Sequence, residues 1–305
     1  MVTNDPTISE PSPRPRVGVM FDRDRKPEEL PAFARAVEEY GADDLWVVED
    51  LGWTGSIGSA TLALAATERL RVGIGILPAP LRNPALLAME LANLARVFRG
   101  RFIAGVGHGV PEWMAQVGAA SPTPLALLEE TITVVRTLLR GETATFDGRA
   151  VRIDGVRLVH PPAEPPRVVS GVVRPRSLEL SGRAADGTVM AEGQGPAAIA
   201  AALGHIAKGR AAAGADRPHE LIVFTHLCVA DDPGHVATAS APVRDEYSEW
   251  LGIPREEVFL AAGDAATAAE RVRALWDAGA ATVVLRPVGE DALPQVRAAL
   301  AALER

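Results

Sequence analysis

Short runs of aliphatic and β-branched residues alternate with longer segments of helical periodicity along nearly the whole chain. The apolar runs predict eight strands, at 17–21, 45–49, 72–77, 102–106, 167–170, 188–191, 221–229 and 282–285. The helical spacing of apolar positions predicts helices near 27–40, 56–67, 84–98, 122–140, 176–184, 196–213, 233–250, 267–278 and 291–303. Eight strand–helix units in succession predict an α/β protein with a parallel sheet closed into a (β/α)8 TIM barrel. An open doubly wound sheet is the alternative.

Local signals place several boundaries within this pattern. Asn83 followed by Pro84 is typical of a helix start, with an N-cap side chain and proline at the first helical position. Thr267 with Glu270 has the spacing of a capping box. Alternating residues and two Asp-Gly pairs over 145–158 predict a hairpin inserted between the fourth helix and the fifth strand.

Composition and charge limit the kinds of partner. The chain has 305 residues, with 31 Lys and Arg against 39 Asp and Glu, and a formal net charge of −8. An acidic chain without a basic cluster gives no electrostatic footprint for nucleic acid or an anionic membrane. Cys228 is the only cysteine, which fits a reducing cytoplasm, and no apolar stretch is long enough to span a bilayer. Residues 1–15 predict a flexible tail and 16–305 a single barrel domain.

In a TIM barrel the active site forms at the carboxyl ends of the strands. Glu49 and Asp50 end the second predicted strand, so their side chains point to opposite faces and only one faces the barrel mouth. A carboxylate there suits a general base, or it caps the next helix. His108 stands between two glycines after the fourth strand, either as a partly exposed rim group or as a hydrogen-bonded loop histidine.

Glycines and a helix start add candidate binding groups. Gly105, Gly107 and Gly109 lack the spacing of a dinucleotide fingerprint, so they either let a flat ring or phosphate approach the backbone or form a tight turn. Arg174 and Ser177 flank the start of a helix, which suits a phosphate or is an ordinary capped helix.

The sequence gives no support for a metal site or a Schiff-base lysine. The six histidines lack metal-ligand spacing, and His226 with Cys228 has no third ligand. Lys26 and Lys208, the only lysines, both fall away from predicted strand ends.

Several segments, by their order and spacing, resemble the luciferase-like superfamily of flavin and deazaflavin oxidoreductases. The resemblance covers nearly the whole chain after the tail, and its most specific pieces are 45–50, 82–85, 100–109 and 185–187. It implies a TIM barrel with a tricyclic cofactor over the mouth, against a bulge in the third strand. In relatives this bulge often contains a non-proline cis peptide, and Gly75-Ile76 is the matching position here.

The resemblance also implies roles for individual residues. His108, Glu49 and Asp50 become the candidate catalytic groups, while Trp53 and Trp113 either wall the substrate pocket or belong to the core. The implied cofactor-binding set is Asp22, Gly75, Ile76, Leu77, Val106, Gly107, His108, Gly109, Gly171, Val172, Arg174, Ser177, Glu192, Gly193 and Gln194. Within it, Gly107 and His108 are expected at the ring edge, and residues 171–177 and 193–195 around the ribityl phosphate.

Two positions depart from the family pattern. Deazaflavin-dependent members often have His where this chain has Asp50, and many relatives have Gly-Pro in place of Arg174-Pro175. Even so, two features favour coenzyme F-420 (8-hydroxy-5-deazaflavin) over FMN. One is the Gly-His-Gly segment followed by Trp113, and the other is the near absence of lysine among the basic residues, a bias of the kind found in high-GC bacteria that make F-420.

The predicted function is therefore hydride transfer between C5 of the deazaflavin and a small organic substrate. The alternatives are an FMN-dependent monooxygenase that uses oxygen and a partner reductase, and a cofactor-binding relative without catalysis. A glycosidase acting through Asp22 and Glu49 is a further, weaker alternative. The family resemblance also allows a homodimer.

Overall fold

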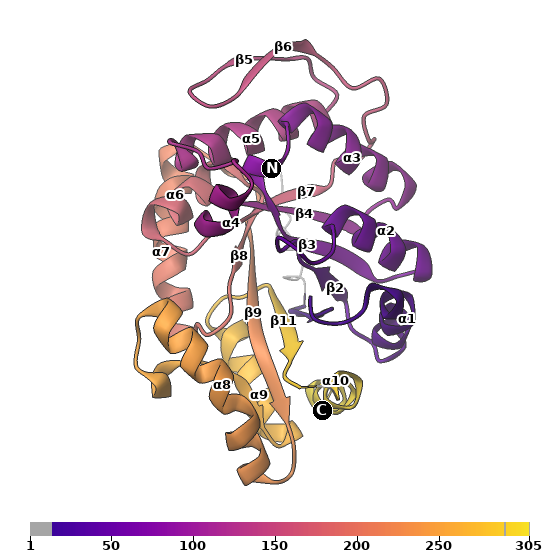
Figure 1. Cartoon of the computed structure of the whole chain (residues 1–305), viewed down its shortest axis with the longest axis vertical. Helices are drawn as coiled ribbons and strands as arrows, with labels where there is room; N and C mark the ends of the chain where they lie inside the picture. The colour runs from indigo at the N-terminus through magenta and orange to yellow at the C-terminus, as the bar shows by residue number, and fades with distance from the viewer. Residues whose placement is uncertain (1–13, 290, 305) are drawn as a thin grey trace, which may run out of the picture.

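The computed structural model describes residues 14–289 and 291–304 (Figure 1). Eight parallel strands pair in a ring, and the pairing of β8 with β9 closes it. The strands are β1 (Arg16–Met20), β2 (Asp44–Val47), β3 (Arg71–Pro78), β4 (Phe102–Gly107), β7 (Arg167–Gly171), β8 (Gly187–Met190), β9 (Glu220–Val229) and β11 (Thr282–Pro287). The predicted TIM barrel is confirmed, and the open-sheet alternative is wrong.

Helices surround the barrel, as Figure 1 shows. They are α1 (Leu30–Glu39), α2 (Ser56–Ala66), α3 (Pro84–Val97), α4 (Pro111–Gln116), α5 (Pro124–Leu139), α6 (Pro175–Ala184), α7 (Pro196–Ala212), α8 (Pro233–Leu251), α9 (Ala265–Asp277) and α10 (Ala292–Leu303). Among the α-helices and strands of the described residues, two short elements were not predicted: α4, and the strand β10 (Ala261–Gly263), which pairs with the end of β9. Neither is long enough to show a clear period in the sequence.

The predicted helix starts have different outcomes. The Asn83 side chain accepts a hydrogen bond from the Ala85 amide at 2.9 Å, so this N-cap is confirmed. The capping box at Thr267 is wrong, because α9 begins at Ala265 and Asp264 is the N-cap. The Asp264 carboxylate accepts a hydrogen bond from the Thr267 amide at 2.7 Å.

The predicted hairpin forms as β5 (Ala144–Asp147) and β6 (Arg152–Val156), which pair antiparallel with each other. It lies outside the ring of helices beyond α5 in Figure 1. Most of the predicted tail, residues 1–13, is outside the described residues. Arg14, at its end, pairs with the Asp43 carboxylate at 2.6 Å.

Two kinds of packing fill the barrel. Inside the ring, an apolar cluster joins Met20, Trp46, Ile103, Val169, Val189, Ile222, Phe224 and Val284. At the amino ends of the strands, which we call the floor, the first residues of five strands form one polar network. Arg71 donates to both Asp44 oxygens at 2.7 Å, and Glu220 accepts from Arg167 at 2.7 Å and Thr282 at 2.8 Å. The floor is therefore closed, and ligand access is left to the opposite end.

Candidate active site

A cavity of about 420 Å³ opens at the carboxyl ends of the barrel strands, and we call it the mouth cavity. Its volume lies in the usual range for cofactor and small-molecule sites. Apolar side chains form much of its wall, among them Met20, Val48, Val189 and Phe224. The carboxyl ends of the strands are also where barrel enzymes place their chemistry, so this cavity is the candidate active site.

The third strand carries a bulge at the edge of this cavity. The register of β3 against β4 shifts between Ile74 and Leu77, and the Gly75–Ile76 peptide bond is cis. Both Gly75 and Ile76 line the cavity. The structure thus has the bulge and the peptide geometry that the family resemblance implied.

Ile76 also explains the glycines beside it. A Cβ on Gly107 would lie 2.8 Å from Cδ1 of Ile76, and a Cβ on Gly105 would lie 3.2 Å from its Cγ2. A Cβ on Gly171 would crowd Cγ2 of Ile76 more closely still. Gly107 and Gly171 therefore make room for the Ile76 side chain, whereas a Cβ on Gly105 would first meet the backbone carbonyl oxygen of Ile74. The sequence interpretation included neither role. Gly109 differs from them, because its φ of +72° favours glycine.

Glu49 and Asp50 both line the cavity, so the expectation that only one faces the mouth is wrong. The cause is that β2 ends at Val47, and the alternation of a strand no longer applies two residues later. Arg82 binds both oxygens of Glu49, and the Ser56 amide and hydroxyl donate to Oε2 at 2.9 and 2.7 Å.

Asp50 is held by one guanidinium. Arg23 donates to Oδ2 of Asp50 at 2.6 Å, and the two side chains are about one quarter exposed. Arg23 also lies over the Trp53 ring, 4.5 Å from its centroid. Both acidic candidates are therefore paired with arginine, although Glu49 is bound at more points than Asp50.

His108 lines the cavity and contacts Ser177 from the start of α6. Nε2 of His108 is 3.1 Å from the Ser177 hydroxyl. Its Nδ1 atom is buried and has no hydrogen-bond partner among the residues that the structure describes. Burial lowers the pKa of His108 from its ordinary 6.5, so the imidazole is neutral at pH 7. A neutral imidazole beside a hydroxyl is able to accept or donate a proton.

Arg286 joins two carboxylates on the other side of the cavity. It donates to Asp22 at 2.7 Å and to Glu192 at 3.2 Å, and the Tyr247 hydroxyl donates to Glu192 at 3.1 Å. Burial opposes the ionisation of Asp22, but Arg286 and the Asp24 amide outweigh it and lower the pKa of this carboxyl. Burial and the Glu192 carboxylate raise the pKa of Tyr247, so its hydroxyl remains a donor. We call Asp22, Arg286 and Glu192 the mouth triad.

The helix α8 supplies a wall that the sequence interpretation missed. Glu246, Tyr247 and Trp250 line the cavity from this helix. The Trp250 ring packs edge-on against Tyr247, with ring centroids 5.7 Å apart. Two aromatic residues three positions apart lie on one helix face, and this spacing within the predicted helix was the available signal.

The remaining predicted residues divide into two groups. Those that line the cavity are Gly109, Trp113, Gly171, Val172, Arg174, Ser177 and Glu192, in addition to the residues described above. Those that do not line it are Asp22, Trp53, Leu77, Val106, Gly107, Gly193 and Gln194. Gly193 instead bridges to Phe259, whose amide donates to the Gly193 carbonyl at 2.9 Å. The expected phosphate contacts of 193–195 thus have no support from their position.

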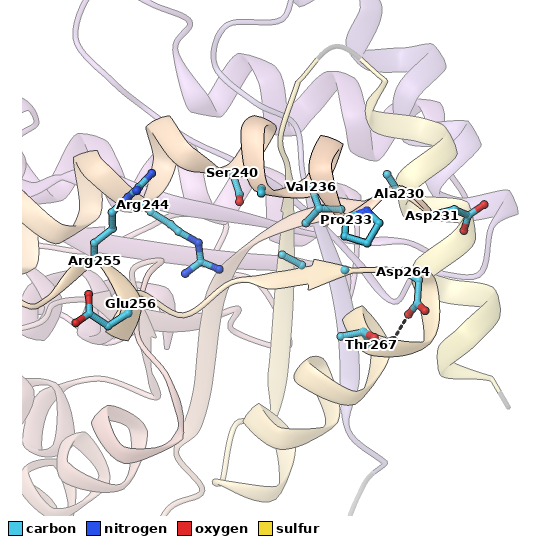
Figure 2. A pocket seen from close by; sticks show the side chains of 13 residues that line it. Ala230, Asp231, Pro233, Val236, Ser240, Arg244, Arg255, Glu256, Asp264 and Thr267 are labelled. Atoms are coloured by element: carbon cyan, nitrogen blue, oxygen red, sulfur yellow. Dashed lines mark hydrogen bonds between the residues drawn. The ribbon is translucent and has the colours of Figure 1, made fainter.

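A larger hollow, of about 740 Å³, lies between α8, the end of β10 and the start of α9 (Figure 2). Arg255 and Glu256 stand at one end of it in Figure 2, and Asp264 stands at the other, occupied as the cap of α9. Its polar side chains do not converge on a common point. We therefore do not treat it as the active site.

The arrangement of possible metal ligands among the described residues as a whole provides no metal site. Within residues 14–289 and 291–304, no group of three or more His, Cys, Asp or Glu side chains is placed to hold a metal ion. No helix within the same residues has the length and hydropathy needed to cross a membrane.

The fold and the mouth cavity define a TIM-barrel protein with a cofactor-sized site at the carboxyl ends of its strands. Residues 9–301 match the family model described as luciferase-like monooxygenase, and the chain belongs to this family. The resemblance drawn from the sequence is therefore confirmed.

Two curated relatives share part of the chain. A 5,10-methylenetetrahydromethanopterin reductase from Methanolobus tindarius is 28% identical over 68% of this chain and 63% of its own length. An F-420-dependent glucose-6-phosphate dehydrogenase from Nakamurella multipartita is 31% identical over 56% of this chain and 54% of its own length. The chain thus spans somewhat more than half the length of these relatives.

Solved structures share the fold over almost the whole chain. The coenzyme F-420-dependent tetrahydromethanopterin reductase from Methanopyrus kandleri superimposes with a TM-score of 0.83 at 20% identity, covering 95% of this chain and 98% of its own. The oxygenating constituent of 3,6-diketocamphane monooxygenase from Pseudomonas putida, in complex with FMN, gives a TM-score of 0.72 at 17% identity, covering 95% and 96%. At these identities the likeness concerns the fold.

Proposed function

We propose that this protein is an oxidoreductase that transfers a hydride between coenzyme F-420 and a small organic substrate. The observation that carries the proposal is the make-up of the mouth cavity. An apolar space walled by the Gly75–Ile76 bulge has Arg174 at its edge, at the N-cap position of α6. The curated relative from Nakamurella multipartita, which is named as an F-420-dependent glucose-6-phosphate dehydrogenase, supports the choice of cofactor.

The residues present fit such a cofactor. Val48, Ile76 and Val189 offer an apolar surface to a flat ring. Arg174 makes no ion pair with any described residue, and no side chain caps the start of α6, so the amides that follow Pro175 are left for a phosphate. The guanidinium and the helix terminus would together hold the ribityl phosphate. Arg174 takes this role although many relatives have glycine at its position.

The chemistry supplied by the bound coenzyme would be hydride transfer at its ring. The protein would orient the ring against the bulge, exclude water with the apolar wall, and move the accompanying proton. His108 is the best-placed group for that proton, because it lines the cavity, makes no ion pair with any described residue, and has a ring that is neutral at pH 7. Glu49 is less suited, since Arg82 and Ser56 already occupy its oxygens. Asp50 would act only after release from Arg23.

The cofactor is tested by titrating the purified protein with F-420 and with FMN while following absorbance and fluorescence. We expect saturable binding of F-420, and at least ten-fold weaker binding by Arg174→Ala protein. Arg176→Ala is the matched control, because Arg176 is an exposed arginine of the same helical turn that does not line the cavity. Tight FMN binding without F-420 binding would favour the monooxygenase alternative. Equal effects of the two arginine variants would remove the phosphate role of Arg174.

The role of His108 requires a catalytic readout. We expect His108→Ala protein to bind F-420 within three-fold of wild type but to lose at least ten-fold in turnover of any alcohol or sugar that the wild-type protein oxidises. Unchanged turnover would exclude His108 from proton transfer. Saturable cofactor binding by the wild-type protein with no turnover over a broad substrate panel would support the alternative of a non-catalytic relative.

We also propose that the chain forms a homodimer through the outer faces of α2 and α3. Leu62 on α2 and Leu86 and Met89 on α3 have side chains that are 49%, 59% and 57% exposed. Apolar residues this exposed on neighbouring helices in the chain are typical of an interaction surface. Light scattering with size-exclusion chromatography tests the dimer, and a Leu86→Lys, Met89→Lys variant should be monomeric if these residues form the interface.

A further inference from the structure

We infer that the mouth cavity selects an uncharged substrate with an apolar or aromatic body and rejects anionic substrates. The inference rests on the proposed function for the identity of the cavity as the substrate site. The charge and shape of the substrate are not determined by which cofactor is bound.

The cations that line the cavity are already engaged, with one exception. Arg23 is bound to Asp50 at 2.6 Å. Arg286 is bound to Asp22 at 2.7 Å and to Glu192 at 3.2 Å. An anionic substrate would have to displace a carboxylate that is already in place, and the displaced carboxylate would remain beside it. Neither arginine is therefore available to an anion.

Arg174 is the exception among the described residues that line the cavity, and the cofactor phosphate would occupy it. The charges that remain are acidic. The mouth triad combines two carboxylates with one guanidinium, so it carries one net negative charge. Glu246 on α8 lines the cavity, is exposed and makes no ion pair with any described residue. Carboxylates in a partly desolvated wall repel a phosphate or carboxylate group, and specificity against it follows.

The unpaired surface of the cavity is aromatic and aliphatic. Trp250, 49% exposed, and Val110, 38% exposed, line it, as does Trp113. Half-exposed indole rings at the edge of a cavity gain most from contact with an apolar or aromatic body. The side chains of His108 and Ser177, which share one hydrogen bond at 3.1 Å and both line the cavity, suit a single hydroxyl or carbonyl group. The shape and charge of the site thus agree on one substrate class.

The test uses a matched pair of tryptophan quenchers, uncharged 4-nitrobenzyl alcohol and anionic 4-nitrobenzoate, added to the cofactor-free protein. Both titrations are run on wild-type and on Arg174→Ala protein, so that an anion held by Arg174 alone is recognised by its loss in the variant. We expect the alcohol to quench saturably in both proteins, and the benzoate to bind at least ten-fold more weakly than the alcohol in Arg174→Ala protein. Glucose 6-phosphate, the anionic substrate class in the name of one relative, should not displace the alcohol.

Two variant pairs locate the binding. Trp250→Phe should remove a large part of the quenching, whereas Trp53→Phe should retain it, because Trp53 is 45% exposed but does not line the cavity. Glu246→Lys should tighten 4-nitrobenzoate binding at least five-fold. Glu249→Lys, an exposed position of the same helix away from the cavity, should leave it unchanged.

Three results would overturn the inference. They are binding of 4-nitrobenzoate to Arg174→Ala protein as tight as that of the alcohol, displacement of the alcohol by glucose 6-phosphate, and absence of saturable quenching by the alcohol. None of these depends on F-420. A protein that fails to bind F-420 but shows the expected quenching would therefore lose the proposed function while keeping the selectivity of its cavity.

Discussion

At the floor of the barrel, Arg71 binds both oxygens of a fully buried Asp44, and Glu220 links two further strands. At the mouth, Arg286 joins Asp22 and Glu192 in a similar arrangement. The floor network, however, closes one end of the barrel, whereas the mouth triad borders a cavity of about 420 Å³. The same side-chain types thus join strands at one end and shape a binding surface at the other.

The difference lies in which groups remain free. At the mouth, Arg174 and Glu246 make no ion pair with any described residue, and both line the cavity. In TIM barrels, features at the floor generally serve stability, and features at the mouth serve activity. Changes at the floor should therefore lower the free energy of unfolding, and changes at free groups of the mouth should alter binding with little effect on stability.

The largest expected effect is at the floor. Arg71→Met would leave the Asp44 carboxylate buried without its partner, and breaking a buried pair in this way costs about 3–5 kcal/mol. Arg167→Ala is the control, since its side chain is 50% exposed and its pair with Glu220 should contribute less than about 1 kcal/mol. Urea unfolding measures both. Equal losses in the free energy of unfolding would mean that burial does not determine how much each ion pair of the floor contributes.

Acid should weaken the mouth through His226. Burial lowers the pKa of His226 from 6.5 to about 4, and the Tyr247 ring lies 5.0 Å away. Between these values the unfolded chain binds a proton that the folded chain does not, so stability falls as the pH drops from 6.5 to 4 and is level above 6.5. The expected loss from this group is about 3 kcal/mol.

Urea unfolding at pH 7 and pH 4.5, for wild type and for His226→Gln, checks this dependence. The variant should show a weaker pH dependence in that interval, because the proton-binding group is gone. Parallel curves for the two proteins would show that His226 titrates normally.

A smaller effect is expected at Gly171. An added Cβ would crowd Ile76, so Gly171→Ala should cost about 1–3 kcal/mol through overpacking. It should also weaken cofactor binding, since both residues line the cavity. Gly204→Ala in α7 is the control, because nothing lies within 4 Å of its added Cβ, and it should stabilise by about 0.5–1 kcal/mol. Chemical unfolding with F-420 titration distinguishes the two variants.

The sequence predicted the barrel well because its strands are short apolar runs with strong local signals. All eight barrel strands were predicted close to their observed positions, while β10, with three residues, was too short to stand out. The start of α9 was misplaced because Thr267 and Asp264 are both suitable caps. Such a choice depends on where the preceding strand ends, which the sequence alone does not show.

The candidate site was predicted less completely. His108, Asp50 and Arg174 were found at the mouth because they directly follow strands. The contribution of α8 was missed, because only tertiary packing brings Tyr247 and Trp250 over the cavity. The glycines were interpreted locally, yet their partner Ile76 lies on a different strand. Contacts between distant segments were the part that sequence patterns did not contain.

The packing of Ile76 on Gly107 and Gly171 has an evolutionary consequence. A lineage that gains a side chain at one of these glycines first suffers overpacking, whereas a lineage that first shortens Ile76 leaves a void. Either order passes through a less stable intermediate, so the effect of each substitution depends on the others already present. These three positions should therefore change together as divergent members of the family acquire new cofactor or substrate preferences.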